Sequence, residues 1–237
     1  MAKVLGVLTG LALLFSPPVA ETAFAAPTQS ASAKKKSVSR KQAAPAKPFE
    51  LPPLSIAAQR VTDWVADSGD NQALPYIVID KRAAMILVYD AGGKPVASGP
   101  VLIGIAEGDE ATPGVGSKSL SEIGPAEKTT PAGRFLAKFG KAAGNTKVLW
   151  VDYATSVAIH TIPAGNKENR TKRMLSPAID DNRVTFGCIN VPKAIYNGKI
   201  APMFGKKGGY VYILPDTKSL EAAFPALHAR PLADVVR

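Results

Sequence analysis

The sequence predicts a mainly β domain over residues 71–215, and three observations support this prediction. Short runs rich in β-branched and aromatic residues recur along the region, glycines and prolines separate them, and helical spacing appears only near its end. The chain has 237 residues, of which 46% are hydrophobic, so it is apolar enough for a packed core and short enough for one main domain. We therefore expect a compact β domain with accessory segments before and after it.

Residues 1–25 have the pattern of a secretory signal peptide. Lys3 supplies a positive start, residues 4–15 form an apolar stretch broken only by small or mildly polar residues, and Ala23-Phe24-Ala25 provides a small-x-small cleavage site. A helix over those 12 residues would span about 18 Å, well short of the ~30 Å hydrocarbon core of a bilayer. A cleaved signal is therefore favoured over an uncleaved membrane anchor, and we expect the mature chain to be exported.

Residues 26–53 are predicted to be a disordered linker rich in Ala, Pro and Lys, because few of them can bury apolar surface to offset the entropy of folding. Its basic residues are Lys34, Lys35, Lys36, Arg40, Lys41 and Lys47, and the formal net charge of the chain is +10. A solvated linker is the simpler interpretation, and weak contact with an anionic membrane or wall polymer is the functional one. Nucleic acid is not expected as a partner, because the chain is exported and no aromatic residues alternate with the basic ones.

Two patterns follow the linker. Apolar residues at near-helical spacing predict a short helix within residues 54–70, which ends near Ser68-Gly69-Asp70. From Pro75 onward the chain is β-rich, with a hairpin signal at residues 90–93. The expected strands, in order, are Tyr76–Asp80, Met85–Tyr89, Pro95–Gly104, Gly133–Phe139, Lys147–Tyr153, Val157–Thr161 and Tyr210–Leu214.

Three other segments complete the main domain and its end. Residues 192–203 carry the domain's helical pattern, with Pro192 at the first position. Residues 107–130 form a long polar loop rich in Gly and Ser, which is typical of a lid, a binding loop or a mobile insertion. Residues 216–237 form a C-terminal tail, and its apolar residues favour packing on the domain; they are Ala222, Phe224 and Leu227.

Cys188 is the only cysteine, so no disulfide forms within the chain, and one Cys with two His residues excludes a Cys/His zinc cluster. A free cysteine usually behaves as a small buried hydrophobe. Here, however, Thr185–Asn190 follows a polar loop and precedes the helix expected at Pro192. A helix start would favour the thiolate, and the backbone amides of Gly187 and Cys188 would suit an oxyanion. From these features alone, a structural role and a catalytic role for Cys188 are equally supported.

His160 ends the apolar run Val157–Ile159 of a predicted strand. A hydrogen-bonded core histidine is the simpler interpretation of such a residue. The other histidine, His228, lies in the C-terminal tail, and a cysteine nucleophile needs a base whose pKa is near neutrality. Since the loop at residues 163–183 can fold back, we predict that Cys188 and His160 form a thiol acyl-transfer pair.

This arrangement resembles the L,D-transpeptidase family (YkuD-type catalytic domain). The family signature is a histidine, a variable spacer and Ser/Thr-His-Gly-Cys-hydrophobic-Asn, to which His160 and Thr185–Asn190 are similar. Residues 130–135, Thr-Pro-Ala-Gly-Arg-Phe, resemble that domain's Thr-Pro-x-Gly-x-Phe turn. The resemblance covers about residues 75–215, and it implies a compact β-sandwich or barrel with one or two short helices.

The resemblance also implies roles for six residues. Cys188 matches the nucleophile, His160 the general base, and Gly187, together with the Cys188 backbone, the oxyanion site. The remaining matches are the polar flanks Thr185 and Asn190 and the residue after the base, Thr161, which helps to orient the imidazole.

Two features depart from the family pattern. Phe186 stands where the family has a second histidine, and it can neither donate a hydrogen bond nor carry a charge. The spacer between His160 and Thr185 is 24 residues long, which is longer than usual. Because His160 and Cys188 are kept, these departures bear on substrate choice more than on the reaction itself.

The resemblance implies an enzyme of the periplasm or cell wall that cross-links peptidoglycan stem peptides, without a metal or an organic cofactor. A thioester on Cys188 would be resolved by an amine from another stem peptide or from a wall-anchored protein. If water is the acceptor, the same Cys–His site gives an L,D-carboxypeptidase or another wall-peptide hydrolase. The alternative of a different class is a non-catalytic module that binds the cell wall.

Overall fold

Ten strands build the part of the chain that the computed structural model describes, residues 49–165 and 168–229. The predicted signal peptide and most of the predicted linker lie outside these residues. The strands are β1 (Tyr76–Asp80), β2 (Met85–Tyr89), β3 (Pro95–Pro100), β4 (Ile103–Gly104), β5 (Gly133–Lys141), β6 (Lys147–Asp152), β7 (Val157–Thr161), β8 (Arg183–Thr185), β9 (Ile189–Val191) and β10 (Gly209–Ile213).

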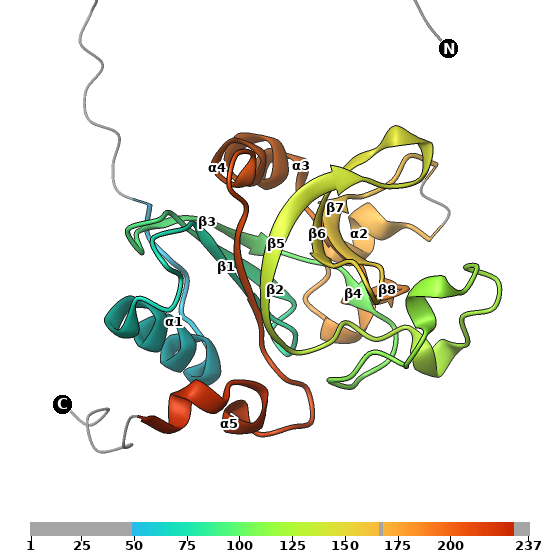
Figure 1. Ribbon diagram of the computed structural model, residues 1–237. Helices are drawn as coiled ribbons and strands as arrows, with labels where there is room; N and C mark the ends of the chain where they lie inside the picture. The colour runs from blue at the N-terminus through green and yellow to red at the C-terminus, as the bar shows by residue number, and fades with distance from the viewer. Residues whose placement is uncertain (1–48, 166–167, 230–237) are drawn as a thin grey trace, which may run out of the picture. The chain divides into compact units, whose positions relative to one another are not determined.

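Eight of these strands form one sheet in the order β3-β2-β1-β10-β5-β6-β7-β9, and β4 pairs with β8. The long sheet curls, and β5 bends strongly across its centre (Figure 1). A bridge between Leu102 and Asn190 ties β9 back to the segment between β3 and β4. The sheet is therefore nearly closed and barrel-like, and the predicted mainly β fold is confirmed.

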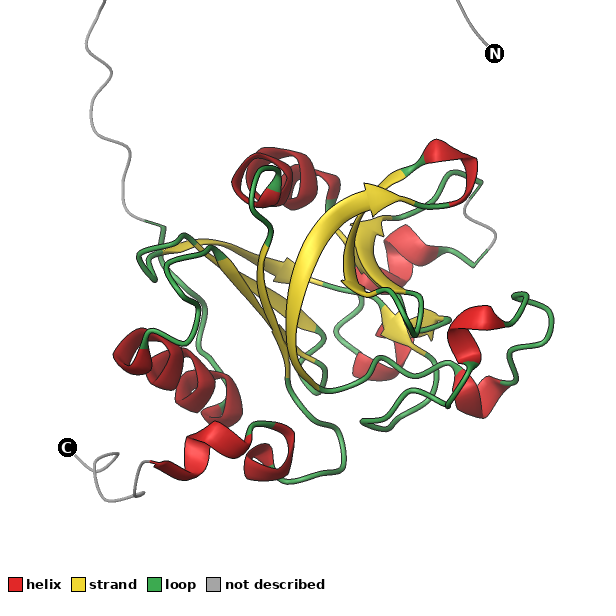
Figure 2. Cartoon of the chain, in the orientation of Figure 1, coloured by secondary structure: helices red, strands yellow, loops and turns green. Residues whose placement is uncertain are grey.

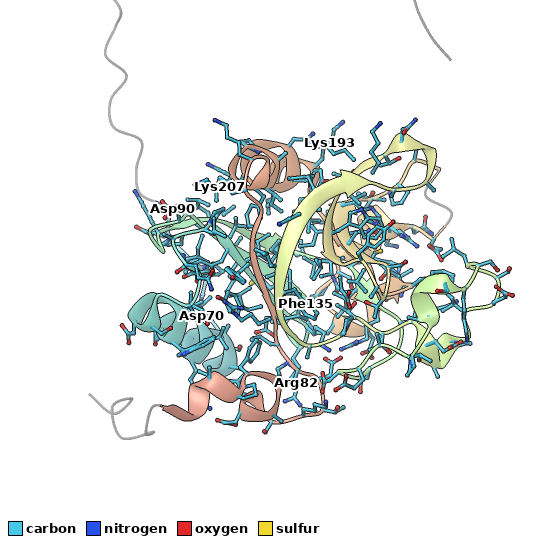
Figure 3. The ribbon with its side chains drawn as sticks, viewed as in Figure 1. Asp70, Arg82, Asp90, Phe135, Lys193 and Lys207 are labelled. Carbon is cyan, nitrogen blue, oxygen red and sulfur yellow. The ribbon has the colours of Figure 1, made fainter. Side chains whose placement is uncertain are left out.

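Alternating side chains divide the central strands between two cores, because successive residues of a strand point to opposite faces. In β1, Ile77 and Ile79 belong to the core inside the curl, whereas Tyr76 and Val78 face a second core. Phe135 of β5 packs against the inner core and lies near the centre of the molecule (Figure 3). Both faces of β1 are thus buried.

Short helices cover the outside of the sheet (Figure 2). They are α1 (Ile56–Ser68), α2 (Arg170–Met174), α3 (Lys193–Ile195), α4 (Ala201–Phe204) and α5 (Leu220–Ala223). Helix α1 begins at the N-cap Ser55, whose side chain accepts from the Ala58 amide, and ends at Gly69 in the left-handed conformation. Among the described helices, none combines the length and the hydropathy that a membrane crossing requires.

The C-terminal segment packs beside α1. Trp64 of α1 lies 6.4 Å from Phe224, measured between ring centroids, and Arg60 forms a 2.7 Å ion pair with Glu221. Phe224 and Leu227 are buried in the second core, as the tail's apolar pattern predicts, but Ala222 is exposed. The two elements lie on the same side of the sheet (Figure 1).

Two strands were missed by the sequence analysis, and both flank the nucleophile candidate. Strands β8 and β9 lie on either side of residues 186–188, where the sequence predicts a loop that leads directly into a helix. The helical segment instead begins at Lys193, after Pro192, and contains a π-helical turn at Tyr196–Ile200 between α3 and α4. Cys188 therefore precedes a strand rather than a helix.

Candidate active site

The parallel pairing of β7 with β9 brings the two predicted reactive residues to the same part of the sheet. His160 lies opposite Asn190 and Ile159 opposite Ile189. Asn190 and His160 therefore share a face of the sheet, and Cys188, which directly precedes β9, lies two residues before this pair. Two parallel neighbouring strands need a crossover connection of a dozen or more residues. The pairing of β7 with β9 therefore explains the long 24-residue spacer, residues 161–184.

A tight turn presents Cys188. Gly187 has a φ of +119°, and a Cβ atom there would lie 2.7 Å from the Thr129 carbonyl oxygen, so this position requires glycine. The Thr185 hydroxyl donates to the Cys188 carbonyl at 2.5 Å and accepts from the Gly187 amide at 3.1 Å. Thr185 therefore fixes the turn by bonding to both of its ends.

Thr130 supports the same turn from the neighbouring segment. Its buried hydroxyl donates to the Gly187 carbonyl at 2.8 Å and accepts from the Gly104 amide at 2.9 Å. Thr130 is the first residue of the Thr-Pro-x-Gly-x-Phe motif at residues 130–135, which by itself assigns no role to the threonine. That motif is the signal from which its importance could have been suspected.

The Gly187 amide is not open to an oxyanion in this structure. It donates to Thr185, although the resemblance assigned the Gly187 and Cys188 backbone to the oxyanion site together. Among the hydrogen bonds of the described residues, none is donated by the Cys188 amide. Of the two amides that the resemblance assigns to the oxyanion site, that of Cys188 is therefore the one that remains for it.

The Cys188 thiol is half-buried, and its surroundings disfavour the thiolate. Burial raises its pKa above the ordinary 9.0, and a backbone hydrogen bond from Ala158 and the charge of Arg170 oppose that shift only in part. The expectation that a helix start would hold Cys188 as a thiolate is wrong, because β9 follows it directly. The thiol donates instead to the Ser156 carbonyl at a sulfur–oxygen distance of 3.5 Å.

His160 is oriented by the next residue of its own strand. Its Nδ1 lies 2.8 Å from the Thr161 carbonyl oxygen, an arrangement that assigns the proton to Nδ1 and the free lone pair to Nε2. Burial lowers the pKa of His160 below 6.5; the bond to Thr161 opposes this shift, and the charge of Arg170 adds to it. In the described part of the chain, no hydrogen bond joins His160 to Cys188 in this resting arrangement.

Asn190 packs on the imidazole. Its amide nitrogen lies 3.5 Å from His160 Nδ1 and 3.3 Å from Nε2. One ring carbon separates these nitrogens, so a group in the ring plane at both distances would collide with that carbon, and the amide must lie over the ring face. The Asn190 side-chain oxygen accepts a 3.0 Å hydrogen bond from Arg170 on α2, a residue that the sequence analysis did not single out.

Phe186 carries a cation on its ring. The Lys128 ammonium lies 3.8 Å from the ring centroid, a cation–π contact. Phe186, which stands where the family pattern has a second histidine, has no ionisable group. The Lys128 ammonium nevertheless places a positive charge over its ring. The predicted long polar loop thus reaches the turn at residues 185–188 through Lys128, and through Thr129 and Thr130 next to it.

A hollow of about 460 Å³ is lined in part by Ser156, whose carbonyl accepts from the Cys188 thiol, whereas Cys188 and His160 are not among its lining residues. Trp150 and Tyr153, 5.1 Å apart between ring centroids, form its aromatic wall. Its other lining residues are Gly116, Ser117, Lys141, Ala142, Ala143, Ala154 and Ser156. Within the described residues, no group of three His, Cys, Asp or Glu side chains is arranged to hold a metal ion.

Comparison with known structures gives the following matches. The catalytic domain of an L,D-transpeptidase from E. faecium matches with 19% identity and a TM-score of 0.36, over 59% of this chain and 95% of that chain. The helical cell shape determining protein Pgp2 from Campylobacter jejuni matches with 16% identity and a TM-score of 0.42, over 68% of this chain and 57% of that chain. The chain thus spans less than two thirds of Pgp2. No curated protein matches the chain significantly.

A comparison with protein families identifies the region that contains this site. The family model described as the L,D-transpeptidase catalytic domain, YkuD, matches residues 74–197. This range exceeds half of the 237 residues and includes both His160 and Cys188. The chain therefore belongs to the L,D-transpeptidase catalytic domain family.

Proposed function

We propose that this protein is an exported L,D-transpeptidase that cross-links peptidoglycan stem peptides through a thioester on Cys188. The observation that carries the proposal is the parallel register of β7 and β9, in which His160 pairs with Asn190, two residues beyond Cys188. The resting charges also support it, because a neutral imidazole can accept the proton of a neutral thiol. Export is inferred from the sequence of residues 1–25, which lie outside the described residues, and from the location of the substrate.

Acylation begins when the thiol leaves the Ser156 carbonyl and turns toward the imidazole. His160 Nε2 accepts the thiol proton, and the sulfur attacks the carbonyl carbon of the third, diamino-acid residue of a tetrapeptide stem. The Cys188 amide donates to the oxyanion that forms. The C–N bond to the terminal D-Ala then breaks, and the imidazolium of His160 protonates the departing amine.

Transfer to the acceptor restores the enzyme. The amine of a second stem peptide, or of a wall-anchored protein, attacks the thioester carbonyl and gives a proton to His160. The C–S bond breaks, the new amide forms the cross-link, and the imidazolium returns its proton to the Cys188 sulfur. We assign the hollow lined by Trp150 and Tyr153 to a stem peptide, because it lies next to Ser156, whose carbonyl holds the thiol at rest.

Incubation of the purified protein with muropeptides that carry tetrapeptide stems tests the proposal. We expect cross-linked dimers and free D-Ala by mass spectrometry, and neither product from the Cys188→Ser variant. Tripeptide stems without dimers would show that water is the acceptor and that the enzyme is an L,D-carboxypeptidase. Unchanged muropeptides would contradict an enzymatic role and favour a wall-binding module.

A further inference from the structure

Arg170 reaches the active site from the crossover between β7 and β9. It is the first residue of α2, and its side chain is 15% exposed. One terminal nitrogen donates to the Asn190 side-chain oxygen at 3.0 Å. Its Nε and the other terminal nitrogen contact Glu168 Oε2 at 2.8 and 2.7 Å. The guanidinium is thus held between a buried amide and a half-exposed carboxylate.

The surrounding crossover fixes α2 in place. Met174, at the end of α2, is buried in a small core with Leu102 and Val184. The buried Asn182 donates to the carbonyls of Val101 and Met174 at 2.9 and 3.4 Å. These contacts tie both ends of the segment after α2 to the sheet, so the position of Arg170 over Asn190 is set by the fold.

Arg170 connects to the base through a single residue. Asn190 is fully buried, accepts from Arg170 with its oxygen, and places its nitrogen over the His160 ring. An amide whose oxygen is bonded in this way cannot rotate without losing a charge-assisted hydrogen bond, which is stronger than a neutral one. The position of the Asn190 amide over the His160 ring therefore depends on the hydrogen bond that Arg170 donates.

We propose that Arg170 is a positioning residue of this active site: it holds Asn190 against the His160 ring and presents a fixed positive charge to both Cys188 and His160. The inference rests on the proposed function for its catalytic meaning. The charge of Arg170 lowers the pKa of the Cys188 thiol and that of the His160 imidazole alike. Loss of this charge should therefore raise both pKa values.

Other charged groups around the site are arranged differently. Glu168 is the partner of Arg170 and moderates its charge. Lys128 lies on the Phe186 ring, 3.8 Å from the ring centroid. Asp152 of β6 accepts from the Thr155 hydroxyl at 2.7 Å and from the Ala154 amide at 3.0 Å. Of these groups, Arg170 is the one that hydrogen-bonds to Asn190.

Titration of the two reactive groups in the full chain tests the inference. Cys188 is the only thiol, so the rate of iodoacetamide alkylation against pH follows this one group. The His160 ring signal in NMR, assigned with a His228→Gln variant, follows the base. In Arg170→Met, we expect both midpoints to rise and alkylation at pH 7 to slow by about threefold to tenfold. In Arg170→Lys, which keeps the charge, both midpoints should remain close to those of the wild type.

Two further variants separate this effect from general damage. Lys172→Met removes one positive charge from an exposed position of the same helix, and its midpoints should match the wild type. Glu168→Gln removes the negative charge paired with Arg170. The titration midpoints of Cys188 and His160 should therefore both fall, in the opposite direction to those of Arg170→Met. The inference is overturned if the Arg170→Met titrations coincide with the wild type, or if Lys172→Met shifts them equally.

These titrations do not depend on turnover. If muropeptides remain unchanged while the Arg170 variants shift both midpoints as expected, the proposed function fails and the positioning role of Arg170 stands. If muropeptides are cross-linked but the Arg170→Met midpoints do not move, the function stands and the positioning role fails.

Discussion

His160 Nδ1 lies 2.8 Å from the carbonyl oxygen of Thr161, and this contact makes Nε2 the nitrogen that can act as a base. The orienting group is a backbone carbonyl, so no side chain needs to supply it, and replacement of Thr161 should matter less than replacement of His160. Thr161, which matches the family residue after the base, thus contacts the imidazole through its main-chain carbonyl rather than through its hydroxyl.

His160→Ala should slow acylation of Cys188 by about 10²–10⁴, because the thiol then loses its general base. The measurement is the rate of adduct formation with a carbapenem, followed by intact-mass spectrometry. His228→Ala, which changes the other histidine of the chain, is the matched control and should acylate at the wild-type rate. Equal rates for His160→Ala and the wild type would remove His160 from the mechanism.

The pH dependence of the wild type should show two neutral groups at rest. Alkylation of Cys188 should have its midpoint above 9.0, because burial raises the pKa of the thiol. The His160 ring should titrate below 6.5, because burial lowers the pKa of the imidazole. Acylation should therefore increase as the pH rises through the His160 midpoint and then stay level up to the thiol midpoint. An alkylation midpoint near neutrality would instead indicate a thiolate that exists before substrate binds.

Gly187→Ala should disrupt the turn that presents Cys188. A Cβ atom would lie 2.7 Å from the Thr129 carbonyl oxygen at a φ of +119°, so the backbone must shift. We expect a loss of about 1–3 kcal/mol in the free energy of unfolding, together with slower acylation. Gly198→Ala is the control, since an added Cβ there meets nothing within 4 Å; it should leave both measurements close to the wild type. A Gly187→Ala variant with wild-type acylation would show that this geometry is not needed.

A buried ionic cluster contacts Thr130, whose hydroxyl bonds to the Gly187 carbonyl in the turn before Cys188. Lys81, which is fully buried, bonds to Asp109 at 3.0 Å, to Asp216 at 3.1 Å and to the Thr130 carbonyl at 2.9 Å. Arg82, beside it in sequence, donates to the Asp216 carbonyl at 3.0 Å and lies near the lower edge of the molecule (Figure 3). The cluster thus connects the end of β1 to the residue whose hydroxyl holds Gly187.

Asp109→Asn should cost about 3–5 kcal/mol in the free energy of unfolding, because it breaks a buried ion pair. Burial alone would raise the pKa of Asp109, but amides of Lys218, Asp216 and Thr217 and the Lys81 ammonium outweigh it and lower the pKa well below 3.8. A depressed carboxyl pKa stabilises the fold above pH 3.8 and loses this effect as the pH falls further. In denaturant unfolding at several pH values, the free energy of unfolding of Asp109→Asn should therefore fall less on acidification than that of the wild type.

Glu110→Gln provides the comparison for that stability measurement. Glu110 pairs with Lys218, but its side chain is 75% exposed, and exposed pairs contribute at most about 1 kcal/mol. The variant should therefore unfold almost as the wild type does. If Asp109→Asn cost no more than Glu110→Gln, the buried cluster would not be a main support of the fold.

The predicted strands match the structure where the sequence repeats a pattern over five or more residues. Tyr76–Asp80 and Met85–Tyr89 agree with β1 and β2 in both bounds, since their long β-rich runs fill two cores. Strands β8 and β9 have three residues each, too few to show a period. Their formation depends on pairing with residues far away in the sequence, which is why the helix-start expectation for Cys188 failed.

The candidate reactive residues could be identified from the sequence because Cys and His are rare in it, whereas the residues that position them could not. Cys188 is unique and only two histidines exist, so composition alone narrows the choice. Arg170 belongs to a run with Lys172 and Arg173, and nothing in that run distinguishes it. Only the crossover geometry selects Arg170, because it places this residue, and not its neighbours, on Asn190.

The intact mass of the protein after exposure to a carbapenem tests the central claim most directly, since a carbapenem is an acyl donor that a nucleophilic thiol opens. We expect the wild-type mass to rise by one ring-opened molecule, with the adduct on the peptide that contains Cys188, and no increase for Cys188→Ser. An unmodified wild-type protein, or an equal adduct on Cys188→Ser, would contradict the account.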